Sequence, residues 1–300
     1  MGHWTQVAPQ YGTEDGVTAL AVLNGRLYGG SMHTGLLLRW TGSAWTQVAA
    51  QYLSEAVIYS LVTFNGKIYG GSSNGYLLQW NGSNAWTSVA SQYGSNDDIR
   101  LVVFNNQIYG GGAGQGSLLQ WNGSNAWVEV APQYDTEAIH SLIVYNGKIY
   151  GGGVWHGLLL QWNGTNAWVE VASGPTGVSH IYDMAVYGGE LYGCTLGGGL
   201  PFLKWNGVDA WIQVALGPGD IIWKYAVYNG KLYGGSRGRL YQWNNVNVSW
   251  DMMCNTLNAE TIIESLGVYN RDLFGGTYPS ANLFRADGLP LQDTWMGDDF

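Results

Sequence analysis

An aromatic residue followed by two glycines recurs along the chain at a nearly constant interval. It stands at seven positions: Tyr28, Tyr69, Tyr109, Tyr150, Tyr192, Tyr233 and Phe274. Successive copies are 41, 40, 41, 42, 41 and 41 residues apart, and in the fifth copy Cys194 replaces the second glycine. A repeat of about 40 residues that fills the chain predicts an array of similar small units.

Each unit contains four short segments of strand-forming residues. In the second unit these are residues 57–64, 67–71, 76–80 and 86–90, called strands a, b, c and d below. The Asn65-Gly66 pair between the first two is a strong signal for a two-residue hairpin. Four antiparallel strands per 40 residues are typical of one blade of a β-propeller. The sequence therefore predicts an all-β fold, a seven-bladed β-propeller of four-stranded antiparallel blades.

The N-terminal segment is expected to close the ring. Residues 4–8 repeat the strand-d sequence of residues 45–49 without change, although they precede the first strand a. We therefore expect them to complete the last blade as its outer strand, with closure by residues 289–295 as the alternative. The propeller would be a single domain spanning residues 1–288, and residues 289–300 would form a C-terminal tail.

The repeat also resembles a known family. A strand ending in two glycines, an aromatic residue on the next strand and a tryptophan at the start of the last one resemble the kelch-type repeat. In the second unit these residues are Tyr69-Gly70-Gly71, Trp80 and Trp86. The resemblance covers nearly the whole chain and implies a kelch-like propeller. It implies little about activity, because that fold is used by scaffolds, lectins and a few enzymes.

Composition and motifs exclude several function classes. The formal net charge of −9 argues against nucleic acid as a partner. No apolar segment reaches the roughly 18 residues of a membrane helix, and the first residues contain no signal-peptide core. An extracellular, virion or surface location is favoured, reached through a leader missing from this chain or through virion assembly or lysis. Cys194 and Cys254 fall in different units and are expected to be free thiols.

Signals for an enzyme are weak. The five histidines show no metal-ligand spacing, and no Gly-x-Ser-x-Gly elbow occurs. We therefore predict a non-enzymatic protein without a metal, a cofactor or a catalytic residue. A polysaccharide-acting enzyme whose carboxylate pair is assembled across blades is kept as an alternative.

The loops on one side of the units diverge, whereas the turns on the other side are near-copies. The a–b turns repeat Asn-Gly at 24–25, 65–66, 146–147 and 229–230. The b–c loops differ, as in Met32-His33-Thr34, Ser73-Asn74 and Val154-Trp155-His156. In a propeller the b–c and d–a loops lie on one side, called the variable face below. Divergence confined to one face is expected of a binding surface.

Charge is divided between the two faces in the same way. The d–a segments hold ten of the 21 acidic residues: Glu14, Asp15, Glu55, Asp97, Asp98, Asp135, Glu137, Asp220, Glu260 and Glu264. The a–b turns hold four of the 12 basic residues: Arg26, Lys67, Lys148 and Lys231. We expect a negative variable face and a mildly positive opposite face. Solubility explains this most simply, and a cation site or face-to-face assembly are the alternatives.

Fourteen of the 16 tryptophans occupy repeated positions or their copies at the chain ends, and we expect them to form the core between blades. The two others, Trp155 and Trp223, lie in loops expected on the variable face. His156, His180 and Tyr182 lie between them in sequence and are also expected in loops of that face. Exposed aromatic rings beside hydrogen-bonding groups can bind sugars, and packing over the blade tops is the alternative. These five residues are the predicted ligand site.

The predicted function is recognition of a carbohydrate, or of a protein such as a surface receptor, through the variable face. A structural or decoration component of a virion, phage tail or surface assembly is the alternative.

Overall fold

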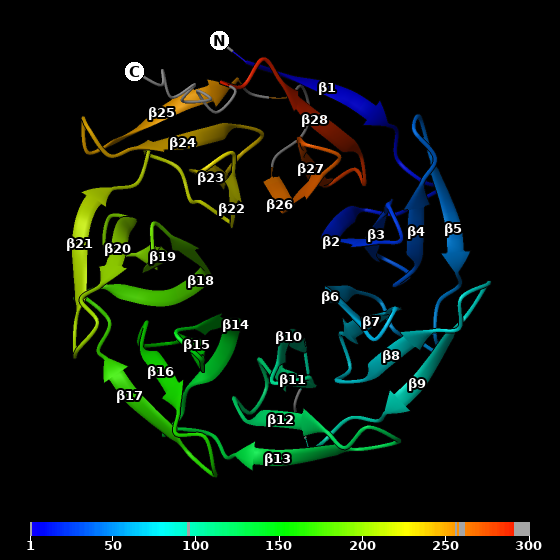
Figure 1. Ribbon diagram of the computed structural model, residues 1–300, viewed down its shortest axis with the longest axis horizontal. Coiled ribbons are helices and arrows are strands. Elements are labelled where there is room, and N and C mark those ends of the chain that lie inside the picture. Colours follow the sequence, from blue (N-terminus) through cyan, green and yellow to red (C-terminus); the bar gives the residue numbers. More distant parts are fainter. Residues whose placement is uncertain (1, 95–96, 256, 258–261, 291–300) are drawn as a thin grey trace, which may run out of the picture.

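The computed structural model describes residues 2–94, 97–255, 257 and 262–290. Within these ranges the regular elements are the strands β1 to β28, and none is a helix. Viewed along its short axis, the molecule is a ring of small sheets arranged around a common axis (Figure 1). The prediction of an all-β propeller is confirmed. The described part of the chain contains no helix that could cross a membrane.

The strands follow the order expected from the repeat. Strands a, nearest the axis, are β2 (Gly16–Leu23), β6 (Ile58–Phe64), β10 (Arg100–Phe104), β14 (Ala138–Tyr145), β18 (Val178–Tyr187), β22 (Lys224–Tyr228) and β26 (Ile262–Tyr269). Strands b are β3 (Arg26–Met32), β7 (Lys67–Ser72), β11 (Gln107–Gly111), β15 (Lys148–Val154), β19 (Glu190–Gly197), β23 (Lys231–Gly235) and β27 (Asp272–Tyr278). Strands c are β4 (Leu37–Trp40), β8 (Leu77–Trp80), β12 (Leu118–Trp121), β16 (Leu159–Trp162), β20 (Pro201–Trp205), β24 (Leu240–Asn244) and β28 (Leu283–Asp287). Strands d are β5 (Trp45–Ala49), β9 (Trp86–Ala90), β13 (Trp127–Ala131), β17 (Trp168–Ala172), β21 (Trp211–Leu216), β25 (Ser249–Cys254) and β1 (His3–Ala8).

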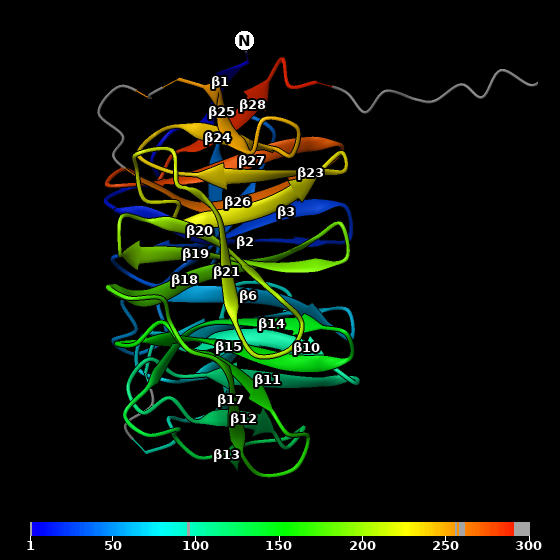
Figure 2. The same ribbon diagram turned by 90° about the vertical axis from the view of Figure 1, so that its left-hand side faces the viewer.

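Over the described residues these strands form five sheets of four strands and one sheet of eight. Within each unit, a pairs with b, b with c, and c with d, all antiparallel, as in β2-β3-β4-β5. The eight-stranded sheet joins two such units through one residue pair, Val154 of β15 opposite His180 of β18. Seen from the side, the sheets lie one above another, from β28 and β25 at the top to β12 and β13 at the bottom (Figure 2).

The N-terminal strand completes the last sheet, as the sequence predicted. β1 pairs antiparallel with β28, from His3 opposite Asp287 to Ala8 opposite Leu283. The side-chain amide of Gln6 donates a hydrogen bond to the Asn282 side chain at 2.9 Å. Of the predicted C-terminal tail, residues 291–300 lie outside the described residues.

A buried valine or isoleucine at the start of each strand a explains the paired glycines. The seven residues are Val17, Ile58, Ile99, Ile139, Ile181, Ile222 and Ile263, and each is at most 5% exposed. A Cβ on Gly70 would lie 3.0 Å from Cγ2 of Ile58 in the same unit, and one on Gly71 would lie 2.3 Å from the carbonyl oxygen of Ile99 in the next. The glycines therefore permit close approach between neighbouring sheets. Neither has a positive φ, so conformational freedom is not the reason for this pair.

The repeated tryptophans form the predicted core between sheets. Trp127 is 5% exposed, and its Nε1 donates a hydrogen bond to the carbonyl oxygen of Gly75 in the preceding unit at 3.1 Å. Nε1 of Trp121 donates in the same way to Val89 at 3.1 Å. These two tryptophans thus hold their sheet to the preceding one by both apolar burial and hydrogen bonds, whereas the indole N–H groups of Trp45, Trp205, Trp211 and Trp250 are buried without a hydrogen-bond partner among the described residues. Cys194 and Cys254 are buried and free, as expected.

Candidate functional site

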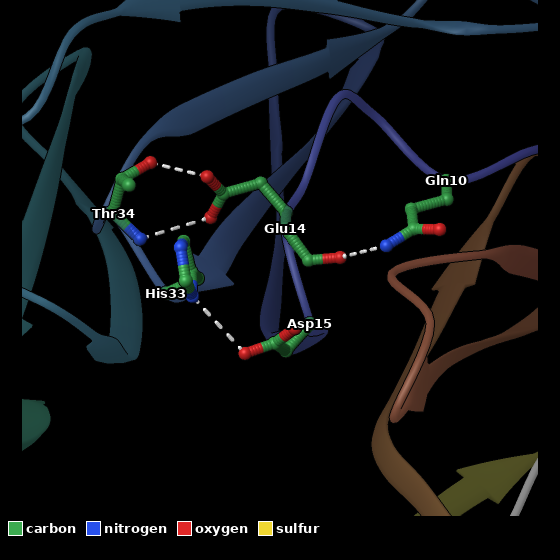
Figure 3. Close-up of polar contacts among 5 residues, drawn as sticks. All are labelled: Gln10, Glu14, Asp15, His33 and Thr34. Carbon is green, nitrogen blue, oxygen red and sulfur yellow. Dashed lines mark hydrogen bonds and ion pairs between the residues drawn. The ribbon is translucent and has the colours of Figure 1, made fainter.

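Buried glutamates hold the loops of the variable face together. Glu14, in the loop before β2, is 2% exposed and accepts hydrogen bonds from the Thr34 hydroxyl and, at 3.2 Å, from its backbone N–H (Figure 3). The Gln10 side chain donates to the Glu14 carbonyl oxygen at 2.8 Å, and His33 pairs with Asp15 at 3.2 Å. The carboxylate therefore fastens a b–c loop to the preceding d–a loop. We call this arrangement the loop clamp.

The loop clamp recurs in two other units with different partners. Glu55, 1% exposed, accepts hydrogen bonds from Ser73 at 3.2 Å and from the Asn74 backbone and side-chain N–H groups, both at 2.9 Å. Glu137, also 1% exposed, bonds Nδ1 of His156. The structure thus places His156 in the loop clamp, in the position that Thr34 has in the first unit. The signal in the sequence is the motif Gln-Tyr-x-x-Glu, which begins at residues 10, 51 and 133.

The expected negative surface is therefore only partly present. Three of the acids assigned to it, the clamp glutamates, are buried, because each binds the neighbouring loop instead of facing solvent. Asp220 pairs with Arg239 at 2.6 Å, and Glu264 lines a central cavity. Glu260 lies outside the described residues. Within the described ranges, no three His, Cys, Asp or Glu side chains gather in a way that could hold a metal ion.

Four of the five predicted site residues form one continuous line of rings, called the aromatic run below. The centroids of Trp155 and His180 are 6.2 Å apart. The rings of His180 and Tyr182 stack at 5.5 Å with 15° between their planes, and Tyr182 meets Trp223 edge-on at 4.8 Å. His140, which was not predicted, packs against Tyr182 at 4.7 Å. The line crosses three units, from the loop after β15 through β18 to the residue before β22.

The outer end of the aromatic run is exposed and its backbone is unusual. Trp155 is 62% exposed and has a φ of 96°. Positive φ is sterically costly for a bulky residue and is found mainly where a structure imposes it. His33, in the corresponding position of the first unit, has a φ of 113°, whereas neither Ser73 nor Asn74 in the clamped loop of the second unit has a positive φ. The first and fourth units therefore share a loop conformation that holds Trp155 at a cost in backbone energy, and the loop clamp by itself does not impose it.

The prediction that His180 and Tyr182 lie in loops is wrong. Both belong to β18, which begins at Val178 because this strand a is longer than the others. The pairing of β18 with β19 shifts between Ile181 and Asp183, so Tyr182 is the extra residue of a β-bulge. A bulge redirects a side chain out of the regular alternation of a strand. Here it turns the Tyr182 ring toward the axis.

Bulges at the same place in other units build the wall of a central cavity. The extra residues are Thr18, Tyr59, His140, Tyr182 and Glu264. With Arg100 and Lys224, they line a cavity of about 210 Å³, which continues into a second one of about 180 Å³. Met32 and Trp223, which flank loops of the variable face, also line the first cavity and place it at that end of the axis. The aromatic run thus leads from the exposed Trp155 into this cavity.

The cavity contains charged groups of both signs. Lys224 pairs with Asp183 at 3.7 Å, and Asp183 accepts a hydrogen bond from the Tyr225 backbone N–H at 2.8 Å. Burial raises the pKa of Glu264, while Lys224 and Arg100 act against this rise. Burial, assisted by the same two cations, lowers the pKa of His140 well below its usual value. His140 is therefore neutral at physiological pH.

Sequence reasoning found Tyr182 and Trp223 but missed the other cavity residues, although a signal for most of them exists. Most follow the repeated valine or isoleucine of their unit directly, and their side chains differ in chemistry where the preceding residue does not. Thr18, Tyr59, His140 and Glu264 are examples. When one position of a strand differs between units while its neighbours are the same, its side chain is not needed for packing between the sheets. Such a position is expected to face a cavity or the solvent.

Comparisons with known proteins show the fold. No family model matches the sequence, and no curated protein is similar to it. The structure is similar to the extracellular domain of a putative one-component system from B. thetaiotaomicron (TM-score 0.76, 14% identity, covering 94% of this chain and 39% of that one). It is also similar to YCF48 bound to D1 peptide (0.73, 13%, covering 94% and 96%) and to the WD40 β-propeller domain of Doa1 (0.66, 15%, covering 94% and 96%). These likenesses establish a β-propeller.

The first of these proteins is much longer than the present chain, which spans 39% of its length. The kelch-type assignment is not confirmed by these structures and stays a prediction. The structure gives the positions of the five predicted site residues, and their role in binding a ligand stays a prediction.

Proposed function

We propose that this chain is a non-enzymatic recognition propeller that binds carbohydrate through its variable face. The observation that carries the proposal is the aromatic run, which connects the exposed Trp155 to the cavity wall at Tyr182 and Trp223. The faces of sugar rings carry apolar C–H groups that pack on aromatic rings, while their hydroxyls need hydrogen-bonding partners. The aromatic run supplies the rings, and the polar side chains of the cavity supply the hydrogen-bonding partners.

The cost of presenting Trp155 supports a role in binding. A tryptophan that is 62% exposed contributes little to folding, yet it is held at a positive φ that a glycine would accept without strain. Strain of this kind is concentrated at functional sites. The backbone energy would be offset when a ligand covers the ring.

We propose further that the fold is a kelch-like propeller of seven blades in one domain, residues 1–288. Seven blades are supported if the eight-stranded sheet is counted as two blades joined at Val154 and His180. An extracellular or surface location fits a carbohydrate ligand, and one similar structure is an extracellular domain.

A protein partner on the same face is the second candidate. It is favoured by the similar structure of YCF48, which was solved with a D1 peptide bound. The loops of the variable face differ from unit to unit, as a protein-binding surface also requires.

A glycan array that carries both neutral and acidic glycans tests the proposal. The wild-type chain is expected to bind a subset of the array, and Trp155→Ala is expected to lose that binding while keeping the wild-type unfolding midpoint. A folded wild-type chain that binds no glycan, but is retained by a protein partner through the variable face, would contradict carbohydrate recognition.

A further inference from the structure

Arg100 brings a positive charge into the cavity that the described residues do not neutralise. Its guanidinium lies 4.2 Å from the centroid of the Tyr59 ring, and its Nη1 donates a hydrogen bond to the Asp98 carbonyl oxygen at 3.1 Å. Throughout the part of the chain that the structure describes, no carboxylate forms an ion pair with Arg100. A guanidinium has about five N–H donors, so most of them are left for a ligand or water.

The other charged groups of the cavity do not supply the missing partner. Lys224 and Asp183 already form a pair at 3.7 Å. Glu264 lines the same cavity, but it forms no ion pair with Arg100 or with any other described residue. The cavity therefore presents a cation and a carboxylate at separate places, and both are available to a ligand.

Partial burial favours an anion beside Arg100. Loss of hydration lowers the pKa of its guanidinium, although Asp98, Tyr59, Glu264 and Asp183 act in the opposite sense. A partly buried cation that forms no ion pair loses hydration without compensation, and a bound anion offsets that loss. A carboxylate matches a guanidinium especially well, because it accepts two parallel N–H hydrogen bonds. Stacking on Tyr59 limits the orientations of the guanidinium, which reduces the entropy lost on binding.

We propose that the sugar residue entering this cavity is acidic, with its carboxylate bound by Arg100 and its hydroxyls donating hydrogen bonds to Glu264. This inference rests on the proposed carbohydrate function and specifies the ligand of the same site. A cavity of about 210 Å³ admits one small residue, since sites for drug-sized ligands measure about 300–1,000 Å³. A peptide carboxylate would also suit Arg100, but it brings no set of hydroxyl donors for Glu264. An acidic sugar satisfies both groups.

The test compares methyl β-D-glucuronide with methyl β-D-glucoside by calorimetry on the full chain. The two probes differ only in C6, which is a carboxylate in the glucuronide and a hydroxymethyl group in the glucoside. The glucuronide is expected to bind roughly 10- to 150-fold more tightly, the range for a hydrogen bond to a charged group. Arg100→Gln is expected to abolish this preference and leave the affinity for the glucoside within about twofold. Lys231→Gln, an exposed lysine outside the cavity, is the matched control and keeps the preference.

The outcomes separate this inference from the proposed function. Equal affinity of the wild-type chain for both glycosides overturns the acidic ligand and leaves carbohydrate binding intact; this comparison needs no variant to fold. Binding of neither glycoside also overturns the inference, and the glycan array then decides whether the proposed function falls with it. A third outcome is that the chain binds a peptide with a free C-terminal carboxylate instead of the glucuronide, and that Arg100→Gln loses this binding. This result overturns the acidic sugar and assigns Arg100 to a protein partner.

Discussion

The buried carboxylate of Glu137 bonds the imidazole of His156, the residue that follows Trp155 in the loop after β15. The same place is taken by Thr34 beside Glu14 and by Asn74 beside Glu55. His156, predicted to touch ligand, is thus also a structural partner of Glu137, and its ligand contact stays a prediction.

Two substitutions of His156 distinguish support of the loop from ligand contact. His156→Ala leaves the Glu137 carboxylate buried without a partner and is expected to cost about 1–3 kcal/mol of unfolding free energy. His156→Asn reproduces the clamp of the second unit and is expected to retain most of both stability and glycan binding. Chemical denaturation and calorimetry measure the two quantities. If His156→Asn folds normally but loses binding, His156 contacts the ligand directly and the clamp assignment is contradicted.

The pH dependence of stability reports on the same carboxylate. Burial raises the pKa of Glu137 above its usual value, and the hydrogen bond from His156 opposes this only in part. A group with a raised folded-state pKa stabilises the protein at low pH and loses that contribution as the pH rises through the folded-state pKa. The unfolding free energy of the wild type is therefore expected to fall relative to that of Glu137→Gln as the pH rises above the usual glutamate pKa of about 4.3. Denaturation curves of both proteins across this range measure the difference, and a constant difference would contradict the assignment.

Substitution of a paired glycine tests the close approach between sheets. The Cβ of Gly71→Ala would lie 2.3 Å from the carbonyl oxygen of Ile99, so one sheet must shift. The expected loss is about 1–3 kcal/mol of stability, as for overpacking in a core. Gly16→Ala is the matched control, because the atoms nearest its Cβ are 3.5 Å away and its φ is not positive. Equal unfolding midpoints for the two variants would show that the sheets do not need the glycine.

Removal of residues 1–9 tests closure of the ring. The deletion takes away β1, exposes the edge of β28 and removes the Trp4 ring, which meets Phe284 at 6.5 Å. A marked fall in the unfolding midpoint and a tendency to aggregate are expected, because an unpaired strand edge is left open. A larger fall on removal of residues 291–300 would mean that the C-terminal segment closes the ring instead.

The sequence was sufficient for the framework because the framework repeats. Residues 4–8 copy residues 45–49, and this identity alone places β1 as an outer strand. Trp155 and Trp223 could be found because they depart from the repeat. Arg100 follows the repeated Ile99, but its place in a cavity could not be found, because the cavity wall combines residues from all the units and forms only when the ring closes.

The errors have a similar origin. Tyr182 was assigned to a loop because a β-bulge has no signature in a single strand sequence. The contact between His156 and Glu137 was missed because Glu137 stands 19 residues earlier and was counted as surface charge. Both positions depend on pairings between segments, which a local pattern does not reveal.

The affinity of Trp155→Ala for a glycan bound by the wild type is the most direct test of the account. Loss of the exposed ring is expected to weaken binding by about 1–3 kcal/mol and to change stability by no more than about 0.5 kcal/mol. Trp223→Ala is expected to weaken binding by a similar amount. Trp127→Ala, which removes a core ring, is expected to cost roughly 3–5 kcal/mol of folding stability instead. Unchanged glycan affinity in a folded Trp155→Ala, or unfolding of that variant as readily as Trp127→Ala, would contradict recognition along the aromatic run.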